Sequence, residues 1–107
     1  MILTGIKKDG KKPLILQEVL LECNISELDK IITFLTKTRN DFVQAPNYSY
    51  DDVLSAGEDT IAPHRHINLE EKMWDIKNPD IIVSVPFKAR KREDGQIIWE
   101  DMELSVS

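Results

Sequence analysis

The two histidines of the chain, His64 and His66, are separated by a single residue. On a β-strand, side chains at positions i and i+2 point to the same face, so both imidazoles could bind one metal ion. Carboxylates nearby in the sequence, at Glu58, Asp59 and Glu70, could complete the ligand set. The spacing therefore allows a metal-dependent enzyme, which we rank third among the functions considered.

The two histidines and Glu70 form a His-x-His-x3-Glu string, which resembles part of the first metal motif of the cupin family. The resemblance is confined to residues 64–70. The family pattern needs a further histidine downstream, and none follows His66. The glycines that frame the motif are also missing, since Gly57 lies one residue too far upstream and Lys77 stands where a glycine is expected. We therefore reject a cupin and expect no cofactor and no strongly bound metal.

Other catalytic patterns are missing from the sequence. No serine stands in a G-x-S-x-G context, and the four glycines form no phosphate-binding loop. Cys23 follows an apolar stretch, where we expect a buried and unreactive thiol. Neighbouring carboxylates are common in the chain, but adjacency in sequence does not create two acid–base environments. The sequence therefore favours a protein that is not an enzyme.

The basic segment of residues 88–92 (KARKR) is the one pattern that suggests nucleic-acid binding. Acidic residues surround it in the expected hairpin, at Glu93, Asp94, Glu100 and Asp101, and neutralise most of its field. No apolar run approaches the ~18 residues needed to span a membrane. The first residues lack the charge order and apolar length of a signal peptide, so we expect none. We therefore expect a cytoplasmic protein that binds neither nucleic acid nor membranes.

The net charge of −5 comes from one stretch of the chain. Residues 51–80 contain three Lys/Arg and eight Asp/Glu, whereas the segments on either side are each within one charge of neutral. Such a region attracts a basic protein partner, although solvated loops are also often acidic. Nine residues in this region or just before it are candidates for partner binding: Asp51, Asp52, Glu58, Asp59, Glu70 and Glu71, with Tyr48, Tyr50 and Trp74 as apolar anchors.

Residues 81–88 and 96–106 are expected to form a hairpin around a two-residue Asp94-Gly95 turn. This turn pairs Phe87 with Met102 on one face and Arg90 with Trp99 on the other. Arg90 and Trp99 could form a cation–π pair or an anchor at an interface, and the rest of the fold could instead cover the tryptophan. We include both residues among the candidates for partner binding.

The remaining elements follow from turn and periodicity signals. Residues 2–7 and 14–23 flank an Asp-Gly and Pro turn, which indicates a hairpin with a long connection because a tight turn would pair lysines. Asn24 and Glu27 form a capping-box pattern before a helix that is expected to run from about 25 to 40 or slightly beyond. Its apolar positions are Ile25, Leu28, Ile31, Ile32, Leu35 and Phe42. A short helix is possible around Val53 and Leu54.

We therefore predict a single α+β domain over residues 1–107, with the order β-β-α-loop/short helix-β-β. Four or five strands would form one antiparallel sheet, and the main helix would pack on one of its faces. The leading function is a non-enzymatic protein that presents an acidic surface to a basic partner. Immunity proteins, which neutralise bacterial toxins, are a concrete example of such inhibitors. The alternative is a structural or accessory subunit that associates with itself, so both a monomer and a homodimer are considered.

Overall fold

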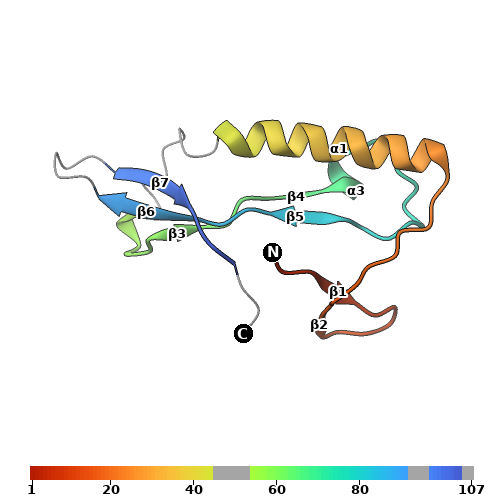
Figure 1. Ribbon diagram of the computed structural model, residues 1–107, viewed down its shortest axis with the longest axis horizontal. Coiled ribbons are helices and arrows are strands. Elements are labelled where there is room, and N and C mark those ends of the chain that lie inside the picture. Colours follow the sequence, from red (N-terminus) through yellow and green to blue (C-terminus); the bar gives the residue numbers. More distant parts are fainter. Residues whose placement is uncertain (45–53, 92–96, 105–107) are drawn as a thin grey trace.

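The computed structural model describes residues 1–44, 54–91 and 97–104 (Figure 1). In these ranges the fold is α+β, with one long helix, one short helix, and seven short strands in three small antiparallel sheets. The α+β class is therefore confirmed, whereas the expected single sheet of four or five strands is wrong. The element order is β1 (Thr4–Ile6), β2 (Pro13–Ile15), α1 (Ile25–Gln44), β3 (Thr60–Ile61), β4 (His64–His66), α3 (Ile67–Glu70), β5 (Ile82–Ser84), β6 (Phe87–Lys91) and β7 (Ile97–Asp101).

Helix α1 begins with the predicted capping box. The backbone N–H of Glu27 donates to Asn24 Oδ1 at 2.8 Å, and the backbone N–H of Asn24 donates to Glu27 Oε1 at 3.0 Å. These bonds satisfy backbone donors that the first helical turn leaves unpaired. The helix continues to Gln44, four residues beyond the expected end near residue 40.

The sheet is divided at two prolines. Ile61 pairs with Phe87 between β3 and β6, and three positions further along each strand His64 pairs with Ser84 between β4 and β5. The register is thus continuous, and the backbone N–H of Val85 still donates to the Pro63 carbonyl at 3.1 Å. Proline has no N–H to donate to the ladder, so Pro63 and Pro86 interrupt one ribbon and leave two short sheets.

The hairpin of β6 and β7 is shifted by one residue from the predicted register. Phe87 pairs with Asp101 rather than Met102, and Ala89 pairs with Trp99. The predicted register is therefore wrong, and the predicted Asp94-Gly95 turn lies outside the described residues, between the strand ends at Lys91 and Ile97. A one-residue shift moves each side chain of one strand to the other face relative to its partner. Trp99 consequently lies on the same face as Phe87.

The N-terminal hairpin has the long connection that we predicted because a tight turn would pair lysines. Strand pairing between β1 and β2 ends at Ile6 and Pro13, so residues 7–12 connect the strands. The backbone N–H of Gly10 closes a turn on the Lys7 carbonyl at 2.7 Å, and Asp9 has a φ of 64° within it. Figure 1 shows this hairpin on the opposite side of β4 and β5 from α1.

Two small apolar clusters form the core. One joins Ile31 and Phe34 of α1 to Ile67, with Trp74, Ile81 and Val83 packed against it. The other consists of Ile61, Phe87 and Trp99 under the three strands β3, β6 and β7. Helix α1 buries Ile31, Phe34, Thr38 and Phe42, whereas four other positions of the apolar pattern, Ile25, Leu28, Ile32 and Leu35, are exposed. The buried face of the helix is therefore narrower than its apolar face.

The molecule is long and open for its size. Its extents are 52 × 30 × 21 Å and its radius of gyration is 16.6 Å, against about 13 Å for a compact domain of this length. Its accessible surface is 9,068 Å², against about 6,100 Å² for a compact monomer of this mass. No helix in the described ranges is long and apolar enough to cross a membrane.

Candidate functional site

The two histidines lie on one face of β4, as their spacing predicts. Their ring centroids are 5.4 Å apart and the rings meet edge to face. His66 Nδ1 lies 2.6 Å from Asp80 Oδ2, and Asp80 Oδ1 accepts the backbone N–H of Asn68 at 3.1 Å. Asp80, which sequence analysis did not single out, thus holds the His66 ring in place.

The carboxylate proposed to join the histidines faces a different partner. Glu70 Oε1 accepts a hydrogen bond from Arg65 at 2.9 Å, and Arg65 also contacts Asp41 of α1 at 3.4 Å. Arg65 lies between the histidines in sequence, so its side chain leaves the strand on the opposite face. Among the described residues, no group of three or more histidine, cysteine or acidic side chains is arranged to hold a metal ion.

The acidic candidates within the described residues lie in two separate places. Glu58 and Asp59 are exposed beside β3, where the Asp59 carbonyl accepts the Ala89 N–H at 2.7 Å. Glu70 and Glu71 lie at α3, separated from β3 along the long axis of the molecule (Figure 1). Four further candidates, Tyr48, Tyr50, Asp51 and Asp52, lie outside the described residues, as does Val53 of the expected short helix. Leu54 and Ser55 are helical, and the Leu54 carbonyl accepts the backbone N–H of Gly57 at 3.0 Å in the turn that follows.

Trp74 lies in a groove at the N-terminal end of α1. The groove has a volume of about 310 Å³, and we call it the acidic groove. Three segments of the chain line it: Leu20, Leu21, Glu22 and Cys23 before the helix, Glu27 and Ile31 on it, and Trp74, Asn78, Pro79 and Ile81 after α3. The Trp74 indole N–H donates to the Pro79 carbonyl at 3.2 Å, which fixes one wall of the groove.

Glu27 supplies an ionised carboxylate to the acidic groove. The backbone N–H of Asn24 holds the pKa of Glu27 below its ordinary value of 4.5, and the Asn78 amide, which donates to Glu27 Oε2 at 2.7 Å, lowers that pKa further. Lys30 lowers the pKa by its charge, while burial and the nearby charge of Asp75 act in the opposite direction. Carboxylates of Glu22, Glu27 and Asp75 therefore gather at or beside this groove.

Cys23 is exposed in the acidic groove, so the expectation of a buried thiol is wrong. Residues 16–24 form no strand in the structure, and all of them except Leu16 are exposed. Trp74 was among the candidates predicted from the sequence, whereas Glu22 and Glu27 were not predicted as groove residues. The negative charge of Glu22 and Glu27 lies outside residues 51–80, and only the folded chain brings them to Trp74.

Trp99 and Arg90 do not form the expected pair. Trp99 is 8% exposed and packs with Ile61 and Phe87. Arg90 pairs in register with Ile98, and its guanidinium donates to Glu100 Oε1 at 3.2 Å on the exposed side of the hairpin. The rest of the fold thus covers the tryptophan, which was the alternative considered for it.

The chain matches no known family model, no curated protein and no solved structure. A functional conclusion therefore rests on the geometry and charge of the described residues.

Proposed function

We propose that this protein binds a basic protein partner through the acidic groove, in the manner of small acidic inhibitors such as the immunity proteins that neutralise bacterial toxins. The observation that supports the proposal is the combination of Trp74 with Glu22 and Glu27 around one groove. Apolar walls with acidic groups among them suit a Lys or Arg side chain, which carries its charge on an apolar stem.

The bound side chain would use both features of the groove. Its aliphatic stem would pack on Leu20, Leu21 and the exposed part of Trp74, while its cationic end would meet Glu22 and Glu27. Glu27 is already held by Asn24 and Asn78, so it is oriented before the partner arrives. A pre-organised carboxylate loses little conformational freedom on binding, which favours affinity.

The acidic residues within the segment 51–80 would attract the same basic partner at longer range. Eight Asp/Glu against three Lys/Arg create a negative field in this part of the chain. Such a field accelerates the approach of a basic protein without needing direct contact. Glu58, Asp59 and Glu71 would act in this way, whereas Glu70 is partly neutralised by Arg65.

The experiment is a pull-down from the native cell, followed by affinity measurements on the retained basic protein. Glu22→Lys places a positive charge in the acidic groove and should raise Kd at least tenfold. The matched control is Glu18→Lys, which makes the same charge change at an exposed position in the same segment and should alter Kd less than threefold. Equal effects of the two variants, or the absence of a basic protein among those retained, would contradict the proposal.

A further inference from the structure

A stripe of apolar side chains is exposed along α1, beside the face that packs on the sheet. We call it the α1 stripe, and it consists of Ile25, Leu28, Ile32, Leu35 and Val43, each 40–74% exposed. These positions recur at helical spacing, so they form one line along the helix. An exposed apolar line of this length is typical of a protein interface.

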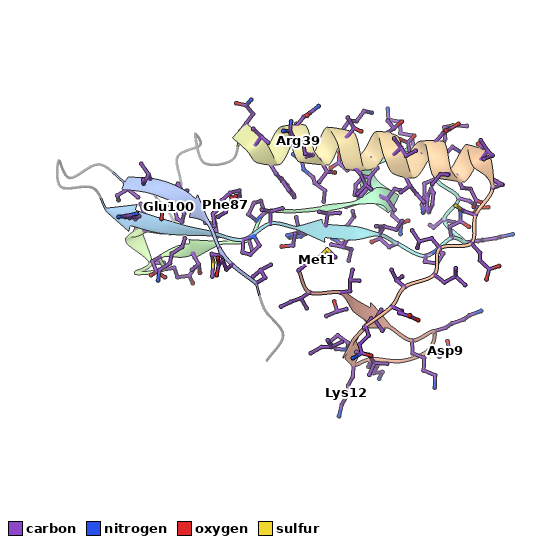
Figure 2. All side chains as sticks on the ribbon, viewed as in Figure 1. Met1, Asp9, Lys12, Arg39, Phe87 and Glu100 are labelled. Carbon is purple, nitrogen blue, oxygen red and sulfur yellow. The ribbon has the colours of Figure 1, made fainter. Side chains whose placement is uncertain are left out.

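A second groove adjoins the C-terminal half of the α1 stripe. It has a volume of about 620 Å³ and lies between Leu35 and Val43 of the helix and three residues on the other side, Val83 of β5, Phe87 of β6 and Val85 between these strands. Figure 2 labels Arg39 and Phe87, which line this groove from the helix and from β6. Leu35 and Val43 belong to both features, so the stripe and the groove form one continuous apolar surface.

The charges beside the α1 stripe select one arrangement of two helices. Asp29 flanks the stripe in its N-terminal half, and Arg39 lies in its C-terminal half, ten residues along the helix. Two parallel copies of α1 would place Asp29 against Asp29 and Arg39 against Arg39. Two antiparallel copies that cross near residue 34 would place each Asp29 opposite the Arg39 of the other copy. Antiparallel packing also opposes the helix dipoles, which is favourable.

We propose that the α1 stripe is the interface of a twofold-symmetric homodimer, in which the α1 helices of two copies pack antiparallel. A twofold interface requires a self-complementary surface, and the pair of Asp29 and Arg39 supplies one. The helix of each copy lies against the groove beside the other helix, as amphipathic helices do in apolar grooves.

A second copy fits this surface better than the basic partner does. The chain carries a net charge of −5, so two copies attract one another only through a locally balanced patch. The stripe has such a balance, whereas the acidic groove carries carboxylates and would repel its own copy. The molecule as a whole also exposes about 3,000 Å² more than a compact monomer, which exceeds the area of about 1,200–2,000 Å² that a standard interface buries.

This inference goes beyond the proposed partner binding and does not depend on it. No residue of the α1 stripe lines the acidic groove. If the chain proves not to dimerise, the expected effect of Glu22→Lys on partner affinity is unchanged. The homodimer and the partner binding can therefore be refuted independently.

Sedimentation equilibrium of the full chain tests the interface. The protein should have twice the chain mass of 12.3 kDa at about 100 µM and dissociate on dilution. Ile32→Lys should raise the dimer Kd at least tenfold, because it places a charge in the centre of the interface. Thr33→Lys makes the same addition on the solvent side of α1 and should leave Kd within twofold. A monomer at about 100 µM, or a dimer insensitive to Ile32→Lys, would overturn the proposal.

A charge exchange tests the antiparallel arrangement. Asp29→Arg and Arg39→Asp should each raise the dimer Kd several-fold, since each places like charges opposite one another. The double variant should return Kd to within about threefold of the original value. Failure of the double variant to recover, with far-UV circular dichroism unchanged, would overturn the antiparallel pairing.

Discussion

Glu27 connects three parts of the chain through one carboxylate. It caps the backbone of Asn24, receives the amide of Asn78, and lines the acidic groove. Because the bond from Asn24 and then that from Asn78 lower the pKa of Glu27, the folded state prefers the ionised carboxylate. By linkage, this preference stabilises the fold above the ordinary pKa of 4.5 and is lost as the pH falls through the lower pKa of the folded state.

Glu27→Gln should therefore change how stability depends on pH in the acid range. The free energy of unfolding of the unmodified chain should fall as the pH is lowered below 4.5, and this fall should be shallower in the variant because the titrating group is gone. Urea unfolding from about pH 7 to pH 3 measures the effect. Glu18→Gln removes an exposed carboxylate before the helix and should retain the original slope. Equal slopes for both variants would mean that Glu27 contributes nothing to the acid sensitivity.

Strand β7 depends on a single large side chain, Trp99. The indole is 8% exposed and contacts Ile61 and Phe87 from two other strands. Trp99→Ala should lower the free energy of unfolding by about 3–5 kcal/mol, because it leaves a cavity in a small core. Ile97→Ala, on the same face but 44% exposed, should cost about 1 kcal/mol or less. Urea unfolding at neutral pH compares the two variants. Similar losses of unfolding free energy in both would show that Trp99 is not buried in solution.

The start of α1 was predictable from the sequence, whereas the register of β7 was not. The capping box of Asn24 and Glu27 is a contact between residues three positions apart, so local spacing suffices to identify it. The face of Trp99 depends on the length of the connection after Lys91 and on cover from Ile61, far earlier in the chain. Cross-strand pairing alone favoured the predicted register, with Phe87 opposite Met102, but tertiary contacts override that local preference.

The candidate site was predictable only in part, because it too is assembled by tertiary contacts between distant segments. Trp74 stood out as a large apolar residue in an acidic region, but the acidic groove also needs residues 20–23 and the first turn of α1. These segments are about 50 residues from Trp74 in sequence, and no periodicity connects them. The division of the sheet at Pro63 and Pro86 was likewise missed, although proline in a strand is a recognisable signal for a break.

The whole molecule combines a small core with two different exposed surfaces. Seven large apolar side chains are buried among the described residues, while twenty are at least 37% exposed. A monomer with this distribution gains little from apolar burial, so association would supply stability that the core lacks. Its acidic groove and its α1 stripe differ in charge, which is why we propose a different partner for each.

The negative field of the molecule should affect the rate of partner association more than the lifetime of the complex. Glu58 and Asp59 are exposed beside β3, well away from the acidic groove along the long axis, so they act on the partner by charge alone (Figure 1). Reversing both to lysine should slow association and flatten its dependence on salt, and dissociation should change less than twofold. Stopped-flow kinetics at about 20 and 200 mM salt would separate the two rates.

Glu22→Lys provides the contrast for this experiment, because it changes a charge inside the acidic groove. It should accelerate dissociation as well, since the cationic side chain of the partner would lose a direct contact. If the double reversal at Glu58 and Asp59 accelerates dissociation as strongly as Glu22→Lys does, the partner touches the β3 end of the molecule. The acidic groove would then not be its principal binding site. The proposal that Glu58 and Asp59 act only by long-range attraction would also be wrong.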